Sequence, residues 1–210
     1  MNFFDNNALK SGKMLPIMEE FYSLQGEGYH TGRAAYFIRL GGCDVGCFWC
    51  DVKESWDASV HPLICVDETV ARAANYPAKA VVVTGGEPLL YNLSYLCEQL
   101  ERFAIKRYLE TSGSEPLTGH WNWICLSPKK KLPTHKNILQ LANELKVVVC
   151  CDSDLIWAES LTDKVMPECK LFLQPEWSQR KSAIPIIVDY IKAHPRWAIS
   201  LQSHKYMNIP

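Results

Sequence analysis

Three cysteines with the spacing C-x3-C-x2-C are the residues best suited to chemistry in this chain. Cys43, Cys47 and Cys50 follow an apolar run and include Trp49 between the last two. Thiolates are the ligands of iron–sulfur clusters and of zinc. A structural zinc site needs a fourth ligand, for which the candidates are Asp51, His61 and Cys65. A cubane cluster held by three thiolates would instead leave one iron open to another ligand, so the spacing alone leaves both metals possible.

A second motif, Thr84-Gly85-Gly86-Glu87-Pro88, follows a run of β-branched residues. Its glycines allow a ligand to approach the backbone, and Glu87 places a carboxylate at a strand end, where it can pair with an ammonium group. The same residues also fit the start of a helix, with Pro88 in the first turn and Glu87 near the positive end of the helix dipole. Because the chain also contains the three-cysteine motif, we interpret this second motif as part of a cofactor site.

The composition is that of one globular domain, which we expect to cover residues 1–210. Hydrophobic residues make up 48% of the chain and charged residues 21%, and the net charge of −1 provides no general attraction for nucleic acid or anionic lipid. No apolar run approaches the roughly 20 residues of a membrane span. The segment 1–7 lacks the basic and apolar parts of a signal peptide, so we expect a cytoplasmic protein.

Short apolar runs alternate with helical patterns along the chain. The expected strands are 35–40, 80–84, 107–110, 123–126, 146–149, 171–173 and 198–201, and the expected helices are 67–74, 93–103, 137–145, 154–159 and 182–194. This alternation predicts an α/β fold with a parallel sheet. A chain shorter than the roughly 250 residues of a complete barrel favours a partial (β/α) barrel of about six parallel strands, with a doubly wound sheet as the alternative. Ligand chemistry is expected where the strands end.

The other six cysteines stand among apolar neighbours, and we expect them to be buried thiols without a role in the chemistry. They are Cys65, Cys97, Cys125, Cys150, Cys151 and Cys169. The total of nine is odd, so the cysteines cannot all pair as disulfides within one chain.

The cysteine motif followed by Gly-Gly-Glu resembles the radical S-adenosylmethionine superfamily. Over nearly its full length, the chain also resembles one family within it, the 7-carboxy-7-deazaguanine synthases. The segments that carry this resemblance are 21–29, 37–40, 43–51, 83–88, 109–113, 127–129, 144–146, 173–175 and 200–210. The first and the last of these are not shared by the superfamily at large, so they carry the specific assignment.

The resemblance implies a radical S-adenosylmethionine type of fold and a carbon–nitrogen lyase of queuosine and 7-deazapurine biosynthesis. Such an enzyme converts 6-carboxy-5,6,7,8-tetrahydropterin to 7-carboxy-7-deazaguanine with loss of ammonia. A reduced [4Fe-4S] cluster splits S-adenosylmethionine into methionine and a 5′-deoxyadenosyl radical. The radical removes a hydrogen atom from the substrate, whose ring then contracts, and the cofactor is regenerated.

The resemblance also assigns roles to individual residues. Cys43, Cys47 and Cys50 would hold the cluster. The expected S-adenosylmethionine site comprises Trp49, Cys50, Asp51, Gly86, Glu87, Ser112, Ser127, Pro128, Lys129, Gln174, Pro175, Glu176 and Trp177. The expected substrate site comprises Leu24, Gln25, Gly26, Glu27, Arg39, Thr84 and Pro210, the last on a C-terminal tail that closes the active site. Glu27 and His204 are the candidates for catalytic proton transfer.

Magnesium is also implied, but one of its expected ligands is missing. The family usually has threonine after the Cys-Asp pair, and its hydroxyl helps to bind the ion. Val52 stands there in this chain and offers no side-chain oxygen. Oxygen from Asp51, a backbone carbonyl, the substrate or water would have to compensate.

Two other functions are compatible with the cysteine motif. An activase that places a radical on a partner protein would share the cluster but needs an open groove. A non-catalytic zinc-binding module would hold zinc and no iron. For the synthase we expect a pterin substrate, a flavodoxin or ferredoxin-type reductant and a homodimer, with no nucleic acid or membrane partner.

Overall fold

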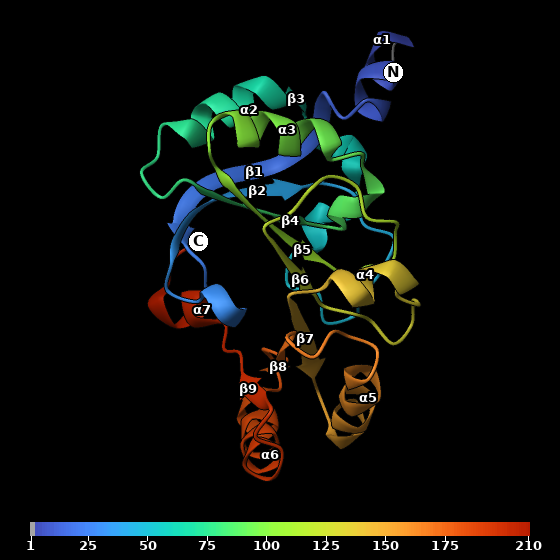
Figure 1. Cartoon of the computed structure of the whole chain (residues 1–210), viewed down its shortest axis with the longest axis vertical. Helices are drawn as coiled ribbons and strands as arrows, with labels where there is room; N and C mark the ends of the chain where they lie inside the picture. Colours follow the sequence, from blue (N-terminus) through green and yellow to red (C-terminus); the bar gives the residue numbers. More distant parts are fainter. Residues whose placement is uncertain (1–2) are drawn as a thin grey trace.

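A single curved sheet organises the chain in the computed structural model, which describes residues 3–210 (Figure 1). Met1 and Asn2, the start of the segment used to argue against a signal peptide, lie outside the described residues. The strands are β1 (Met14–Leu24), β2 (Ala34–Leu40), β3 (Leu63–Cys65), β4 (Ala80–Gly85), β5 (Lys106–Thr111), β6 (Trp123–Leu126), β7 (Glu144–Val149), β8 (Lys170–Pro175) and β9 (Trp197–Ile199). The helices are α1 (Phe3–Lys10), α2 (Val66–Ala74), α3 (Ser94–Arg102), α4 (Lys136–Leu141), α5 (Asp152–Thr162), α6 (Arg180–Ala193) and α7 (Ser203–Met207). Short 3-10 turns lie at η1 (Gly28–His30), η2 (Lys53–Ser55), η3 (Ala58–Val60) and η4 (Pro88–Leu90).

The sheet has nine strands within the described residues, in the order β3-β1-β2-β4-β5-β6-β7-β8-β9. Strand β2 and the strands from β4 to β9 run parallel, which makes seven parallel strands where about six were predicted. Because the order is linear, β3 and β9 remain as edges and the barrel is open. The prediction of a partial (β/α) barrel is therefore confirmed.

The sequence analysis missed the antiparallel strands β1 and β3. Strand β1 pairs with β2 from Ile17–Leu40 to Leu24–Ala34, with an irregularity between Ile17 and Glu19, and β3 pairs with β1. Mixed polar and apolar residues hide β1, because it lies near the edge of the sheet and seven of its eleven residues are only partly buried. The predicted helix 137–145 is also too long, since α4 ends at Leu141 and Glu144 already begins β7.

Alternation along the strands separates a hydrophobic outer face from an inner face that becomes polar toward the carboxyl ends. In β7, Leu145, Val147 and Val149 are completely buried in the main core, whereas Glu144 and Lys146 point to the other face. Helices α2 to α6 pack over the outer face, and their buried residues belong to the same core (Figure 1). A smaller apolar cluster of Ala35, Phe37, Ala80 and Val82 fills the other end of the inner face. The chemistry-bearing side chains therefore gather at one end of the barrel.

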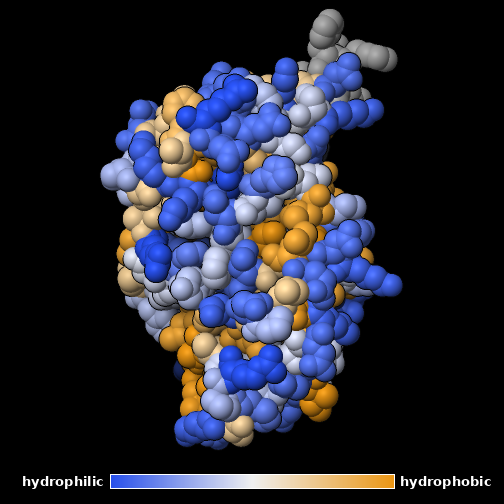
Figure 2. All heavy atoms as spheres, in the orientation of Figure 1, coloured by the Kyte–Doolittle hydropathy of each residue, from blue (hydrophilic) through white to orange (hydrophobic). Residues whose placement is uncertain are grey.

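The outer surface is mixed in character. Figure 2 shows a largely hydrophilic surface over the upper helices, with smaller hydrophobic areas at mid-height and toward the lower left edge. Among residues 3–210, no helix is long and apolar enough to cross a membrane.

Candidate active site

The cysteine loop is held against the Gly-Gly-Glu turn by close contacts between their backbones. The N–H of Gly86 donates to the carbonyl of Leu40 at 3.0 Å, and the N–H of Glu87 donates to the carbonyl of Gly42 at 2.8 Å. A Cβ atom on Gly86 would lie 2.0 Å from the carbonyl oxygen of Gly42 and 2.9 Å from Cβ of Cys43. Only glycine fits at this position, because any side chain would push the cluster loop away.

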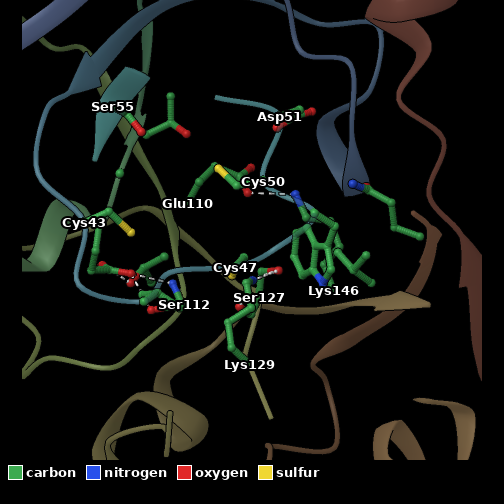
Figure 3. A pocket seen from close by; sticks show the side chains of 18 of the residues that line it. Cys43, Cys47, Cys50, Asp51, Ser55, Glu110, Ser112, Ser127, Lys129 and Lys146 are labelled. Atoms are coloured by element: carbon green, nitrogen blue, oxygen red, sulfur yellow. Dashed lines mark hydrogen bonds and ion pairs between the residues drawn. The ribbon is translucent and has the colours of Figure 1, made fainter. Parts of the chain in front are cut away.

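Cys43, Cys47 and Cys50 line one cavity at the carboxyl ends of the strands, with a volume of about 190 Å³ (Figure 3). All three are free thiols and partly buried. The expected S-adenosylmethionine residues line the same cavity, with one exception described below. The three cysteines and the residues expected to bind S-adenosylmethionine therefore lie together in the structure.

The thiols of this cavity fit a cluster better than a single ion. Among residues 3–210, no three His, Cys, Asp or Glu side chains converge closely enough to hold one metal ion. Thiolates that bind different irons of a cubane stand farther apart than three ligands of one ion. No histidine and no fourth cysteine is found among the residues that line the cavity, and His61 instead contacts the carbonyl of Glu54 at 2.8 Å. The donor set thus fits a cluster with three protein ligands and one open iron.

Glu87 lines the cavity of the three cysteines, which we call the cofactor cavity. Its carboxylate is not free but is bonded within the chain. The residue is 1% exposed. Its carboxylate accepts hydrogen bonds from the N–H of Leu89, from Thr111 Oγ1, and from both the N–H and Oγ of Ser112, at 2.5–3.0 Å. Four bonds fill the accepting capacity of a carboxylate. Both the helix-start interpretation and the cavity position are correct, because Glu87 caps η4 and holds the end of β5 against the cluster loop.

The other cofactor candidates come from the ends of β6 and β8. Lys129 is half-buried, and its ammonium group donates to the carbonyl of Ser127 and, at 2.7 Å, to Ser127 Oγ. It also lies 5.4 Å from the ring centre of Trp49. Burial lowers the pKa of Lys129, and the Cys47 thiol opposes that change.

Two residues expected to bind S-adenosylmethionine, Pro128 and Glu176, have different surroundings in the structure. Pro128 does not line the cofactor cavity but a neighbouring cavity on the outer side, because successive residues of an extended segment face opposite ways. Glu176 lines the cofactor cavity, but its carboxylate accepts hydrogen bonds from Ser178 and from the N–H of Gln179 at 2.5–3.0 Å. Its side chain therefore stabilises the turn before α6.

A second cavity of about 350 Å³ adjoins the first and contains every residue expected to bind substrate. These residues are Leu24, Gln25, Gly26, Glu27, Arg39, Thr84 and Pro210, and His204 lines the same cavity. The two cavities share Glu27, Cys50, Asp51, Thr84, Gly85, Glu110 and Gln202. A ligand in one cavity would therefore face a ligand in the other across a short wall of polar groups.

Arg39 both forms an ion pair and lines the second cavity. Its Nε donates to Glu19 Oε1 at 2.6 Å. The side chain also lines the second cavity, and its Nη atoms form no hydrogen bond within the described residues. Part of the guanidinium fork therefore remains available to a carboxylate.

Lys146 and Glu110 are central to the site, although the sequence analysis assigned neither a role. Lys146 is 3% exposed, and its Nζ lies 2.6 Å from Glu27 Oε2 and 2.8 Å from Glu110 Oε2. Gln25 Nε2 donates to Glu110 Oε1 at 3.2 Å. Their position within apolar strands could have pointed to them. In a run such as Glu-Leu-Lys-Val-Val-Val, the charged residues face the inside of a barrel whose outer face is apolar.

The two candidates for proton transfer differ in their charge at neutral pH. Burial raises the pKa of Glu27, but the Lys146 ammonium and the hydrogen bond from Gln202 outweigh it and lower the pKa to about 2. Burial lowers the pKa of His204 below its usual value, although the Glu27 carboxylate acts in the other direction. At neutral pH the site thus contains a carboxylate at Glu27 and an uncharged imidazole at His204. Glu27 can accept a proton or a hydrogen bond, but it has no proton to donate.

The C-terminal residues pack onto the site through specific contacts. The N–H and Oγ of Ser203 both donate to the carbonyl of Gly26 at 2.9 Å, and Gln202 Nε2 donates to Glu27 Oε1 at 2.9 Å. A Cβ atom on Gly26 would lie 2.0 Å from His204 Nδ1, so this glycine makes room for the histidine ring. Ser23 Oγ donates to the carbonyl oxygen of Pro210 at 3.0 Å.

Asp51 and Val52 do not fit a magnesium ion. The Asp51 carboxylate accepts hydrogen bonds from Lys205 Nζ at 2.5 Å and Gln202 Nε2 at 3.2 Å. Lys205 also lies 4.8 Å from the ring centre of Trp177, so it is held from two sides. The charge of Asp51 is neutralised by an ammonium group of the chain itself, and Val52 lines the cavity without an oxygen.

The remaining cysteines match the expectation in part. Cys97, Cys125 and Cys169 are buried as predicted. Cys65 and Cys150 are partly buried, and Cys151 is exposed, so the prediction was wrong for that thiol. Cys151 precedes α5 at the end of β7, where the chain reaches the surface.

Comparison with known proteins agrees with this geometry. Residues 24–152 match the family model of the 4Fe-4S single cluster domain. A 7-carboxy-7-deazaguanine synthase from Flavobacterium psychrophilum is 54% identical over 204 residues, which cover 97% of this chain and 96% of that protein. The corresponding synthases are 49% identical in Synechocystis, with 92% and 93% of the two chains covered, and 33% identical in Escherichia coli K12, with 92% and 98% covered. A crystal structure of QueE from Escherichia coli superposes with a TM-score of 0.83 at 31% identity, over 97% of this chain and 100% of that one.

The partial barrel and its three-cysteine cavity define an iron–sulfur enzyme of the radical S-adenosylmethionine type. Within that class, the chain belongs to the 7-carboxy-7-deazaguanine synthase family.

The ion pair of Glu27 predicts a specific dependence of stability on pH. A pKa of about 2 against the usual 4.5 means that the charged form stabilises the fold above pH 4.5 and that this contribution is lost as the pH falls toward 2. The size of the shift corresponds to about 3 kcal/mol. Chemical denaturation of wild type and Glu27→Gln should therefore show a difference in unfolding free energy that is largest above pH 4.5 and shrinks by about that amount. Glu168→Gln, at an exposed position, is the control, and a difference that does not change with pH contradicts the ion pair.

Proposed function

We propose that this chain converts 6-carboxy-5,6,7,8-tetrahydropterin to 7-carboxy-7-deazaguanine with loss of ammonia. Family membership supports the reaction, and one structural observation supports it most strongly. The cavity with three thiols opens onto a second cavity that is lined by polar groups and by the C-terminal residues. That arrangement suits a small substrate held beside a cofactor, whereas an activase would need an open groove for a protein.

The cofactors are a [4Fe-4S] cluster on Cys43, Cys47 and Cys50 and S-adenosylmethionine in the same cavity. When bound, they supply the one-electron chemistry that removes a hydrogen atom from the substrate. In the proposal, Trp49, Ser127, Lys129 and the segment 174–177 contact the cofactor, and Glu87 keeps Ser112 in position through its two hydrogen bonds.

The substrate site follows from the donors and acceptors of the second cavity. A pterin presents a guanine-like edge with both donors and acceptors, and Gln25, Glu27 and the loop backbone offer complements to it. The free part of the Arg39 fork pairs with the substrate carboxylate. Leu24, Gly26 and Thr84 complete the walls. Because these groups stand on strands or next to them, the substrate is held in one orientation.

Proton handling falls to Glu27 and His204. Glu27 is ionised, so it acts as an acceptor toward a substrate N–H, and Lys146 keeps it in that state. His204 is uncharged and can accept or donate through its two ring nitrogens. Departure of ammonia requires a proton on nitrogen, which the imidazole can relay between substrate and water.

We further propose that residues 1–210 act as one domain whose C-terminal tail closes the site. The contacts of Gln202, Ser203 and Lys205 with Glu27, Gly26 and Asp51 support this closure. A closed site excludes water from the reaction.

The partners and compartment belong to the same proposal. The reductant is a flavodoxin or ferredoxin-type protein and the enzyme is a homodimer, as the resemblance implies. The cytoplasm is the proposed location, since nine free cysteines among the described residues suit a reducing compartment.

One anaerobic reaction tests the function. It contains reconstituted protein, S-adenosylmethionine, a reductant and 6-carboxytetrahydropterin, with mass spectrometry as the measurement. We expect 7-carboxy-7-deazaguanine, with S-adenosylmethionine regenerated in each turnover, and we expect no deazaguanine from the Cys50→Ala variant. Formation of 5′-deoxyadenosine without the deazaguanine would reject the substrate, and zinc without iron in the protein would reject the enzyme class.

The tail predicts that an extension after Pro210 harms turnover more than folding. Added residues would start at Pro210, which lines the substrate cavity and accepts a hydrogen bond from Ser23, and would crowd the entrance of that cavity. We expect kcat/KM to fall on the order of tenfold to a hundredfold with an unchanged melting temperature. The same extension at the N-terminus, before α1, is the control, since α1 lies far from α7 in Figure 1. Equal kinetics for both proteins would argue against a closing tail.

Asp51, Val52 and Lys205 predict that turnover does not depend on magnesium. We expect the same rate in chelator as in excess magnesium, and no Mn²⁺ binding by electron paramagnetic resonance. The double variant Val52→Thr with Lys205→Met frees the carboxylate and adds a hydroxyl, so it should bind Mn²⁺. A rate for the unaltered protein that rises with magnesium would show that Lys205 does not replace the ion.

A further inference from the structure

Ser200 lies directly after β9 and has a buried hydroxyl group to which the proposed reaction gives no role. The residue is 2% exposed. Its backbone N–H donates to the carbonyl of Leu173 at 2.9 Å, which holds the end of β9 against β8. Its Oγ accepts a hydrogen bond from the N–H of Gly28 at 2.9 Å and donates one to Gln174 Oε1 at 2.8 Å. The hydroxyl thus connects the residue after Glu27 to a residue that lines the cofactor cavity.

The N–H of Gly28 determines the direction in which the Ser200 proton points. A serine hydroxyl has one proton to donate and two lone pairs, whereas a backbone N–H can only donate. Gly28 therefore uses a lone pair of the hydroxyl and leaves its proton for Gln174 Oε1, the acceptor of that proton within the described residues. Gly28 has little freedom to move, because its φ is +63° and a Cβ atom on it would lie 2.0 Å from Glu144 Oε1. These bonds hold the oxygen of the Gln174 amide toward the serine.

The same hydrogen bond turns the NH2 group of Gln174 toward the cofactor cavity. Gln174 lines that cavity and Ser200 is not among the residues that line it, so the two ends of the amide face different ways. Gln174 is 5% exposed, and its Nε2 donates no hydrogen bond within residues 3–210. A buried donor without a partner costs free energy, because it has lost its contacts with water. Such a donor at the wall of a cavity indicates an acceptor on the ligand of that cavity.

We propose that Ser200 is a positioning residue for S-adenosylmethionine: its hydroxyl orients the Gln174 amide, whose NH2 group donates to an oxygen or ring nitrogen of the cofactor. The inference rests on the proposed function, because it takes S-adenosylmethionine as the ligand of the cofactor cavity. Ser200 acts only through Gln174. Without the hydroxyl, the amide is free to turn and to present its oxygen to the same acceptor, which weakens binding. A fixed partner lowers the cost of ordering the amide when the cofactor binds.

A purely structural tie between β9 and the substrate loop is the alternative role for Ser200. That loop is also held at other points. Ser203 donates to the carbonyl of Gly26 with both its N–H and its Oγ at 2.9 Å, and Glu144 Oε2 accepts a hydrogen bond from the N–H of Tyr29 at 3.1 Å. The backbone bond of Ser200 to β8 does not involve its side chain. Removing the hydroxyl should therefore leave the fold in place, and the two roles can be separated by experiment.

The test measures the dissociation constant of S-adenosylmethionine for the anaerobically reconstituted protein without reductant, so that the cofactor binds and is not cleaved. For Ser200→Ala we expect about a tenfold weaker affinity, which is the usual effect of one lost hydrogen bond in a buried site. The control is Ser160→Ala, an exposed serine whose hydroxyl donates to the carbonyl of Trp157 within α5, and it should leave the affinity unchanged. Iron is measured in every variant, so that proteins with the same cluster content are compared.

A second variant, Gln174→Met, distinguishes positioning from a structural role. Methionine has a similar length and no N–H donor, so this variant should itself weaken binding by about tenfold. In the Gln174→Met background, Ser200→Ala should cause no further loss, because the amide that it orients is absent. Two changes that act independently would instead add, and the double variant would lose about a hundredfold.

The outcomes separate this inference from the proposed function. If the unaltered protein binds S-adenosylmethionine and Ser200→Ala binds it equally well, the positioning role is overturned. A full further loss from Ser200→Ala in the Gln174→Met background also overturns it. These affinities do not involve the pterin, so a non-additive loss supports the positioning role even if no deazaguanine forms, in which case the proposed substrate alone is rejected.

Discussion

The buried ammonium group of Lys146 is the interaction on which the active site depends. It lies between Glu27, on the loop after β1, and Glu110, on β5, and so joins the edge of the barrel to its centre. Removing one partner of such a buried pair typically costs about 3–5 kcal/mol, because the remaining charge is left unpaired. The same contact sets the ionisation of Glu27, which in turn receives Gln202 from the tail. One cation thus organises the wall between the cofactor cavity and the substrate cavity.

Backbone contacts fix the position of the cluster loop. The turn at Gly85 and Gly86 lies against the segment before Cys43, and a methyl group on Gly86 would collide with it. Glu87 then ties this turn to the end of β5 through Thr111 and Ser112. The cluster loop is therefore held from the neighbouring strands, although few of its own residues belong to regular structure. Flexible loops on a rigid sheet are the usual place for such a site.

The sequence by itself determined the parallel sheet and the cysteine and glycine motifs, and all of the predicted site residues except Pro128 line one of the two cavities. It could do so because alternation and turn residues act locally, and because catalytic groups collect at strand ends. Strand β1 was not predicted, since its mixed pattern reflects partial burial beside the short edge strand β3. Only the tertiary structure decided the partners of Lys146, the saturation of Glu87, the outward position of Pro128 and the capture of Asp51 by Lys205. Those contacts join residues up to 154 positions apart, and no local preference encodes which distant charge a side chain will meet.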